Sequence, residues 1–373
     1  MRAILAVNAG SSSVKLALFD ADSADLGRIA HERFEGLDES EERRTAALDA
    51  IAPWCLRHVG SERLAAAGHR VVHGGTVYGD PIVVDDAVLA ALESLVELAP
   101  LHQPHSLAPI RRLGLSHPGL VQVACFDTAF HRGRPPAAER YGLPDWLWQG
   151  GVRRYGFHGL SYEYVAGALR ELAPEVARGR VVIAHLGSGA SLCALRDGRS
   201  VDTTMGFSTL GGLVMGTRCG DLDPGAVLHL LRDGIRSVAQ VEALLYRESG
   251  LRGISGISGD VRDLLASDAP AAREALDCFV LSIVRGIGSM TAMLGGLDAL
   301  VFTAGIGEHS AEIRERVCRA CEWTGLVFDV EANDGAGPRI TKPASRVSAW
   351  VIATDEERMI ALHTRDLLGG SRS

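Results

Sequence analysis

Residues 4–19 read ILAVNAGSSSVKLALF, an apolar strand that runs into a Gly/Ser turn and then into a second apolar strand. The same pattern recurs at residues 181–195, VVIAHLGSGASLCAL. In each case one polar residue, Asn8 or His185, stands where the first strand meets the turn. Two such hairpins far apart in one chain indicate a duplicated domain with two phosphate-facing turns. Two unrelated β-hairpins are the alternative, because Gly/Ser turns are common.

The rest of the chain alternates apolar strands with helical patterns, which is typical of α/β architecture. Its 373 residues suit two domains of ordinary size. Hydrophobic residues make up 47% and charged residues 23%, as in a folded globular protein. The net charge is −8 and no run of Lys or Arg occurs, so we expect no nucleic-acid partner.

We expect neither a membrane partner nor an export signal. No apolar stretch approaches the roughly 20 residues that span a bilayer, and the N-terminus becomes polar too soon for a secretory signal. The seven cysteines are scattered and odd in number, which favours a reducing cytoplasm. Cys318 and Cys321 form a C-x-x-C within a helical pattern. Without a second pair, they predict two cysteines on one helix face rather than a zinc site.

The main domain boundary is placed in the loop marked by Pro135, Pro136 and Pro144. The predicted domains are residues 1–128 together with 355–373, and residues 129–354.

Proline also marks boundaries within each predicted domain. Residues 86–98 predict an amphipathic helix that ends before Pro100, and an irregular segment around Pro104 follows it. In the second domain, residues 202–225 form a long irregular loop rich in Gly and Thr, and residues 271–294 a helix.

Phosphoryl transfer requires backbone N–H groups around phosphate oxygens, a metal, and cations where charge develops. The turns NAGSSS and LGSGAS supply the first requirement, since glycine lets the backbone approach phosphate closely. Lys15 lies just beyond the first turn. GIGE, residues 305–308, is a third candidate contact; its alternative is a simple turn before a helix capped by Ser310. Neither a P-loop nor a Rossmann fingerprint is present.

Two charged residues flank apolar segments of the first domain. Arg70 begins RVVHGG and could hold a carboxylate through two hydrogen bonds; a surface salt bridge is the alternative. Asp127 ends a buried-type strand, where a carboxylate commonly faces a crevice; a helix cap is the alternative.

Two further residues suit the stabilisation of a transferring phosphoryl group. His158 lies between Gly156 and Gly159, so the backbone around its ring is uncrowded; a buried structural histidine is the alternative. Arg218 is the one basic residue of the Gly/Thr-rich loop and suits a charge-stabilising finger.

Two further segments complete the candidates. Asp260 and Arg262 could meet the sugar or base of a nucleotide, or simply form a helix N-terminus. In TDEE, Thr354 and Glu357 fit a capping box, which leaves Glu356 to reach a metal.

Taken together, these segments resemble the acetate kinase family, within the superfamily that joins acetate and sugar kinases, heat-shock chaperones and actin. The resemblance covers nearly the whole chain and is carried by nine motifs in the family's order: NAGSSSVK, GHRVVHGG, FDTAFH, RRYGFHG, HLGSGAS, MGTRCGDLDPG, SGISGDVRD, AGIGE and TDEE.

The resemblance implies a role for each matching position. Asp127 is implied to orient or deprotonate the substrate, His158 and Arg218 to stabilise the transferring group, and Arg70 to bind the carboxylate. Mg²⁺ binding is implied for Asn8 and Glu356. Nucleotide contacts are implied for Lys15, His185, Leu186, Gly187, Ser188, Gly189, Asp260, Val261, Arg262, Gly305, Ile306, Gly307, Glu308 and His309.

The resemblance also implies a fold and a reaction. We expect two actin-like (ribonuclease H-like) α/β domains, each a mixed sheet flanked by helices, with a cleft between them. The expected reaction is reversible, direct in-line transfer from ATP to acetate, giving acetyl phosphate and ADP. It would use Mg²⁺, or alternatively Mn²⁺, in a cytoplasmic homodimer whose dimer surface lies in the second domain.

The chain departs from the family pattern at several positions. Ser188 stands where the family has Asn, Thr76 replaces an acid, and the region of residues 31–60 is shortened. Two alternatives therefore remain: a propionate or butyrate kinase, and a nucleotide-binding chaperone or scaffold without phosphotransfer. The intact set of Arg70, Asp127, His158 and Arg218 argues against the second.

Overall fold

The computed structural model describes residues 1–10, 13–37, 40–232, 236–335 and 337–370. Ser11 and Ser12, two residues of the first predicted turn, lie outside these ranges. The chain forms two compact units, which we describe separately. Unit 1 comprises Met1–Arg132, Gly159–Tyr164 and Asp355–Ser373, and unit 2 comprises Gly133–His158 and Val165–Thr354.

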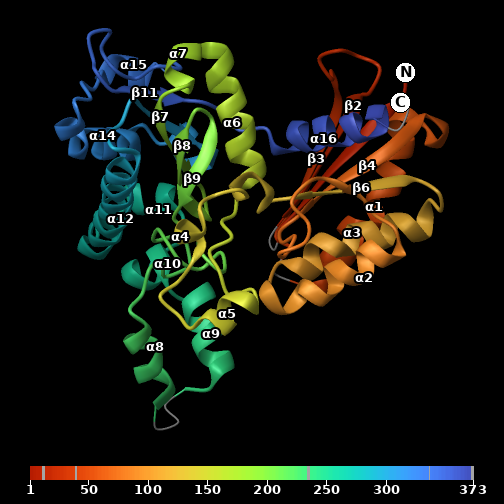
Figure 1. Cartoon of the computed structure of the whole chain (residues 1–373), viewed down its shortest axis with the longest axis horizontal. Helices are drawn as coiled ribbons and strands as arrows, with labels where there is room; N and C mark the ends of the chain where they lie inside the picture. Colours follow the sequence, from red (N-terminus) through yellow and green to blue (C-terminus); the bar gives the residue numbers. More distant parts are fainter. Residues whose placement is uncertain (11–12, 38–39, 233–235, 336, 371–373) are drawn as a thin grey trace. The chain divides into compact units, whose positions relative to one another are not determined.

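Unit 1 contains a mixed six-stranded sheet in the order β3-β2-β1-β4-β6-β5 (Figure 1). The β1–β4 and β4–β6 pairs are parallel, and the other pairs are antiparallel. Its strands are β1 (Ala3–Ala9), β2 (Ser13–Asp20), β3 (Arg28–Glu35), β4 (Leu64–Val71), β5 (Ile82–Val83) and β6 (Val121–Phe126). The first predicted hairpin is therefore confirmed as β1–β2.

Helices cover both faces of this sheet because the side chains of a strand alternate between its faces. In β1, Ile4 and Ala6 pack with α16 (Glu356–Gly370), whereas Leu5 and Val7 pack with α1 (Glu41–Val59) and α3 (Gln103–Ser116). Figure 1 shows α16 on one side of the strands and α1 to α3 on the other. A strand with both faces apolar, as β1 is, thus becomes the centre of a three-layer unit.

One helix of this unit corrects a prediction. The first predicted helix is α2 (Asp86–Ser94), followed by a 3-10 turn at Leu95–Leu98. The segment after it, expected to be irregular, forms α3 instead. Pro104 does not prevent this, because it lies in the first turn, where the helix needs no backbone N–H donor.

Unit 2 contains a mixed five-stranded sheet in the order β11-β10-β7-β8-β9. β7–β8 is an antiparallel hairpin, and β10 runs parallel to both β7 and β11. Its strands are β7 (Arg180–Leu186), β8 (Ala190–Arg196), β9 (Arg199–Thr203), β10 (Ala299–Thr303) and β11 (Ser348–Val351). In both sheets, an antiparallel hairpin therefore lies beside a parallel strand, which confirms the repeat predicted from the sequence.

The remaining helices are mostly short. They are α4 (Pro136–Glu139), α5 (Asp145–Gln149), α6 (Gly159–Leu172), α7 (Pro174–Ala177), α8 (Pro224–Leu231), α9 (Val238–Arg247), α10 (Gly250–Ser255), α11 (Val261–Leu265), α12 (Pro270–Leu294), α13 (Ala304–His309), α14 (Ala311–Ala320) and α15 (Val330–Asp334).

The helix α12 needs a second correction. By length and composition alone it is apolar enough to cross a membrane, contrary to the expectation that no stretch approaches this limit. Its buried residues recur every three or four positions, as in Phe279, Ile283, Ile287 and Met290. Such a stripe is typical of a helix that packs on a core, here on β7 and β8.

The two cysteines of the C-x-x-C motif lie at the end of α14. Cys318 and Cys321 are both buried, and all seven cysteines are free. Burial raises the pKa of the Cys321 thiol to about 12. Across the described residues, no cluster of three or more His, Cys, Asp or Glu side chains is arranged for a metal ion. Both side chains are therefore part of the core, although Cys321 lies just beyond the last residue of α14.

Candidate active site

Asn8 links the end of β1 to the start of α16 in unit 1. Its Nδ2 lies 2.6 Å from Glu356 Oε2 and 2.7 Å from Glu357 Oε1. The predicted capping box is wrong, because Asp355 caps α16 by accepting from the N–H of Arg358 at 2.9 Å. The Glu357 side chain faces Asn8 instead of the helix terminus.

Lys15 is the cation beside these carboxylates. It is directly opposite Asn8 in the β1–β2 register, and its Nζ lies 3.9 Å from Glu357 Oε1. Burial raises the pKa of Glu357; Lys15 opposes this shift and the neighbouring Glu356 adds to it. The carboxylates of Glu356 and Glu357 and the amide of Asn8 thus form one partly buried acidic cluster. A further cation there would relieve the repulsion between the two carboxylates.

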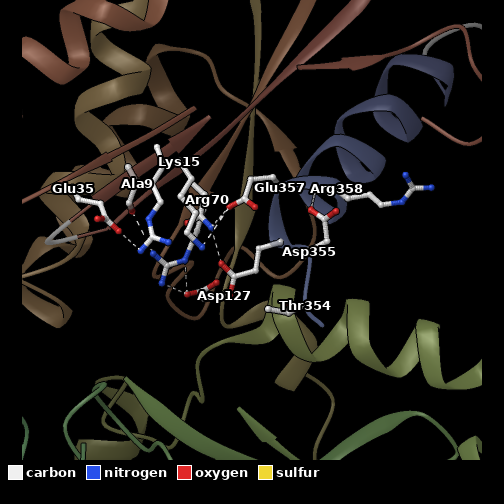
Figure 2. A network of polar contacts seen from close by, with 12 residues as sticks. Ala9, Lys15, Glu35, Arg70, Asp127, Thr354, Asp355, Glu357 and Arg358 are labelled. Carbon is white, nitrogen blue, oxygen red and sulfur yellow. Dashed lines mark hydrogen bonds and ion pairs between the residues drawn. The ribbon is translucent and has the colours of Figure 1, made fainter. Parts of the chain in front are cut away.

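Arg70 and Asp127 form a buried ion pair in the same unit (Figure 2). Arg70 is the penultimate residue of β4, and Asp127 follows the neighbouring parallel strand β6. Arg70 donates to Asp127 Oδ2 from Nε at 2.9 Å and from Nη2 at 2.5 Å, and its Nη1 reaches the carbonyl oxygen of Ala9 at 3.3 Å. The surface salt bridge considered for Arg70 is therefore excluded. Figure 2 shows Lys15 and Glu357 beside the pair.

The second oxygen of Asp127 has no such partner. Asp127 Oδ1 is buried and accepts no hydrogen bond from any described residue. Burial raises the pKa of Asp127, and Arg70 offsets part of that shift. Gly159 packs directly against the Asp127 backbone: its N–H donates to the Asp127 carbonyl oxygen at 2.8 Å, and a Cβ there would lie 2.2 Å from that oxygen. Glycine is therefore required beside Asp127.

In unit 2, His158 has a left-handed backbone, with φ 58° and ψ 25°. Few residues other than glycine adopt this conformation. Its presence at His158 indicates that the surrounding structure constrains the backbone there. The His158 ring stacks on the His185 ring, with centroids 4.0 Å apart and planes inclined by 16°. Its Nδ1 lies 2.8 Å from the Ser191 hydroxyl.

The loop of Gly187, Ser188 and Gly189 joins β7 to β8. The N–H of Gly187 donates to the carbonyl oxygen of Gly189 at 3.1 Å, which closes the turn. A Cβ on Gly189 would lie 3.5 Å from His158 Nε2 and 3.6 Å from Arg218 Nη1. The absence of a side chain at this position therefore keeps one face of the loop open beside both groups.

Arg218 lies in the long segment between β9 and α8, which is irregular as predicted. Its Nη1 donates to the carbonyl oxygen of Thr209 at 3.1 Å. The backbone around it is also held, since the N–H of Gly216 donates to the carbonyl oxygen of Ser188 at 3.1 Å, and Leu251 donates to Met215 at 2.8 Å. The backbone two residues before Arg218 is thereby tied to the Gly187–Gly189 loop.

The residues expected on the adenosine side are engaged locally. Asp260 caps α11 by accepting from the N–H of Arg262, whose side chain also donates to it. Glu308 Oε1 accepts from the N–H groups of Ala304, at 2.8 Å, and Thr354, at 3.1 Å. The cap formed by Asp260 is the helix N-terminus weighed as its alternative. The contacts of Glu308 differ from the simple turn weighed for GIGE, although Ser310 does cap the helix that follows, α14. The nucleotide contacts of these residues stay predictions.

Comparison with known proteins identifies the family. Residues 3–362 match the model of the acetokinase family. The chain belongs to the acetokinase family. It is 50% identical to an acetate kinase of Rhodopseudomonas palustris (strain TIE-1), with 99% of each chain covered. It is 40% identical to an acetate kinase of Rickettsia akari, with 96% of this chain and 97% of the relative covered.

Solved structures of acetokinases share this fold. The acetate kinase of Porphyromonas gingivalis superimposes with a TM-score of 0.87 at 34% identity, covering 99% of this chain and 100% of that one. A propionate kinase from Francisella tularensis superimposes with a TM-score of 0.88 at 32% identity, covering 97% and 99%. The predicted actin-like α/β class, with two mixed sheets flanked by helices, is confirmed.

The acetokinase sequence contains two site residues that motif reasoning missed. The motif TDEE predicts a capping role for Glu357, yet Glu357 contacts Asn8. Ser191 lies opposite His185 in the β7–β8 register. That cross-strand pairing follows from the hairpin itself, so the signal for Ser191 was present in the sequence; the contact with His158 was not.

A divalent metal fits the acidic cluster of Asn8, Glu356 and Glu357 in unit 1. Mg²⁺ usually binds proteins through one or two carboxylates while keeping waters and substrate phosphates as its other ligands. Glu356 and Glu357 supply two carboxylates, and Asn8 supplies an amide whose oxygen and nitrogen can exchange places by a flip. Burial raises the pKa of Glu357 and Glu356 adds to the shift, so a bound cation would favour the ionised form of both acids.

Proposed function

We propose that this acetokinase transfers the γ-phosphoryl group of ATP reversibly to acetate, giving acetyl phosphate and ADP. The observation that carries the proposal is the convergence of His158 Nε2 and Arg218 Nη1 beside Gly189, on a loop suited to phosphate. Family membership and the acetate kinases among its relatives support the same reaction. A nucleotide-binding scaffold would have no use for two convergent donors of this kind.

The residues of the chain act by binding and by electrostatics. Arg70 binds the acetate carboxylate, and Asp127 orients Arg70 and the substrate through its two oxygens. An acetate oxygen forms the new bond to the γ-phosphorus as the bond to the leaving ADP oxygen breaks. Arg218 and His158 donate hydrogen bonds to the equatorial oxygens, where charge is greatest in the transition state.

Asn8, Glu356 and Glu357 would hold Mg²⁺, with Mn²⁺ as the alternative. The metal, when bound, neutralises phosphate charge. Lys15 and the N–H groups of the Gly187–Gly189 loop contact the phosphates, and the segments around Asp260 and Gly305 contact the adenosine. We place the enzyme in the cytoplasm, which agrees with its seven free cysteines.

A hydroxamate assay tests the reaction and the substrate. Purified protein with ATP and Mg²⁺ should form acyl phosphate from acetate with a higher kcat/KM than from propionate or butyrate. One methylene changes binding by only about 1–3 kcal/mol, so all three substrates must be compared over full saturation curves. A preference for propionate would assign the activity named for the Francisella tularensis neighbour. ATP binding without acyl phosphate would favour the scaffold.

The direct transfer has its own test. With ATP made chiral at the γ-phosphorus by oxygen isotopes, one in-line displacement inverts the configuration in acetyl phosphate. Retention would require two displacements and a phosphorylated enzyme, and would overturn the assigned role of Arg218 and His158 in a single step.

We also propose that the enzyme is a homodimer through unit 2. The apolar helix α8 buries none of its eight residues, and Leu228 on α8 and Val238 on α9 are exposed. A second copy would remove such apolar surface from water. Light scattering should show a dimer in the native protein and a shift toward monomer in Leu228→Asp. A monomeric native protein would refute this part.

A further inference from the structure

The His158 ring is held from two directions by one cross-strand pair. Ser191 on β8 lies directly opposite His185 on β7 in the hairpin register. His185 stacks on the His158 ring at 4.0 Å, and the Ser191 hydroxyl lies 2.8 Å from Nδ1. Ser191 is fully buried. A stack and a hydrogen bond together fix both the plane of the ring and its rotation within that plane.

This arrangement decides which nitrogen faces the loop. With Nδ1 turned to Ser191, Nε2 is the nitrogen that lies toward Gly189, where a Cβ would be 3.5 Å away. Arg218 Nη1 approaches the same point, at 3.6 Å. A neutral imidazole carries one N–H only, and the hydrogen bond made by one nitrogen sets whether the other is protonated. The role of Ser191 toward Nδ1, as donor or as acceptor, therefore goes together with the proton state of Nε2.

We propose that Ser191 is a positioning residue that donates its hydroxyl proton to His158 Nδ1, so that neutral His158 carries its proton on Nε2. Nε2 then donates, beside Arg218, toward an anion at the Gly187–Gly189 loop. When the ring is protonated, the same hydroxyl accepts from Nδ1–H, since a serine hydroxyl can serve in either role. His158 thus presents a donor at Nε2 in both of its charge states. The kinetic consequence of this inference rests on the proposed phosphotransfer, but the tautomer does not.

The tautomer can be read without any activity. Long-range proton–nitrogen spectra of the full-length protein, labelled with ¹⁵N-histidine and recorded above the titration range, distinguish the two neutral forms; His158→Gln assigns the signals. We expect the Nε2–H form in the wild type and a population of the Nδ1–H form in Ser191→Ala. An Nδ1–H form in the wild type would overturn the inference, as would an unchanged tautomer in Ser191→Ala.

A double-mutant cycle tests whether Ser191 acts through His158. Ser191→Ala should lower kcat about tenfold with little change in either KM, a coupling of ordinary size for residues in contact. On a His158→Ala background, the same substitution should have no further effect on kcat. Additive losses would show that Ser191 acts elsewhere and would refute the positioning role.

Ser348 on β11 supplies the matched control. It is a buried serine of the same sheet whose hydroxyl accepts from Trp350 Nε1 at 2.8 Å. Ser348→Ala should lower the melting temperature without changing kcat or the His158 tautomer. If Ser191→Ala does not fold, Ser191→Cys, which keeps a small donor, should retain the Nε2–H form and part of kcat; its failure to do so in a folded protein would count against the inference.

Discussion

The Arg70 guanidinium donates from two nitrogens to a single oxygen of Asp127, Oδ2, while Oδ1 stays buried without a partner among the described residues. The two residues therefore act as a unit. Arg70 offsets part of the cost of burying the Asp127 charge, and Asp127 in turn fixes the orientation of the guanidinium. A substitution of either residue changes the electrostatics of both.

Arg70→Leu should consequently affect more than acetate binding. We expect the acetate KM to rise far more than the ATP KM. Without its cation, the pKa of Asp127 should rise further, so residual activity that needs ionised Asp127 should appear only at higher pH. Removing one partner of a buried ion pair costs about 3–5 kcal/mol of stability. Steady-state kinetics across pH and denaturant titrations measure these effects.

The double variant Arg70→Leu/Asp127→Asn is the control for this interpretation. It removes the uncompensated carboxylate, so it should recover stability relative to Arg70→Leu while remaining inactive. Equal increases in both KM values for Arg70→Leu, with no shift in pH dependence, would instead show that Arg70 only supports the fold.

Gly189→Ala should separate folding from catalysis. The added Cβ makes ordinary van der Waals contacts with His158 and Arg218, at 3.5 and 3.6 Å, and the backbone at Gly189 has no positive φ. The melting temperature should change little. However, the methyl group occupies the space beside both donors, so kcat should fall by roughly 10²-fold, as small misplacements at a reacting centre do.

Gly288→Ala in α12 is the matched control for this glycine. No atom lies within 4 Å of the added Cβ, so the change should add about 0.5–1 kcal/mol of helix stability and leave kcat unaltered. An active Gly189→Ala enzyme would show that the open face of the loop does not meet the substrate.

Glu357→Gln should weaken metal use. The substitution removes one of the two acids beside Asn8 while preserving shape, so the Mg²⁺ concentration at half-maximal activity should rise roughly 10-fold or more. Asp355→Ala, which removes the cap of α16, should instead cost about 1 kcal/mol of stability and leave the Mg²⁺ dependence as it is. If Glu357→Gln instead lowered stability without changing the Mg²⁺ dependence, Glu357 would be a helix cap and not a metal ligand.

The stability of unit 1 should fall in mild acid because of His73. Its ring is buried, and Nδ1 accepts the N–H of Gly75 at 2.8 Å, a bond that protonation would break. Burial lowers its pKa from 6.5 to about 4. A depressed folded-state pKa contributes stability that is complete above pH 6.5 and is lost as pH falls toward 4, amounting to about 3 kcal/mol at most.

The unfolding free energy at several pH values between 7 and 4.5 measures this effect. His73→Asn keeps an acceptor for Gly75 but does not titrate. Its unfolding free energy should therefore fall less steeply than that of the wild type as the pH is lowered. Some slope should remain, because burial lowers the pKa of His69 to about 4 as well. A slope identical to that of the wild type would rule out His73 as a contributor.

Local patterns in the sequence predicted most of the architecture. Continuous apolar runs located β1 and β2, and the Gly/Ser turns located both hairpins, because these features depend on neighbours within a few residues. The same local reasoning fails at α3, because it predicts a break at Pro104 although the first helical turn tolerates proline. It fails again at Glu357, where a good local capping pattern loses to a contact with Asn8. The predicted domain bounds, residues 1–128 with 355–373 and residues 129–354, stay a prediction.

The sequence by itself determined the family, the hairpins, and the residue types needed for phosphoryl transfer, since each of these is encoded in short contiguous motifs. Only the tertiary structure decided which of those residues meet. Asn8 contacts Glu356 and Glu357 across 348 and 349 positions of the chain, and His158 contacts Ser191 across 33. No local pattern encodes such pairings, because they arise when β1 packs against α16 and when β8 comes to lie beside His158. Burial, and with it the shifted pKa values of Asp127 and Glu357, follows from the same long-range packing.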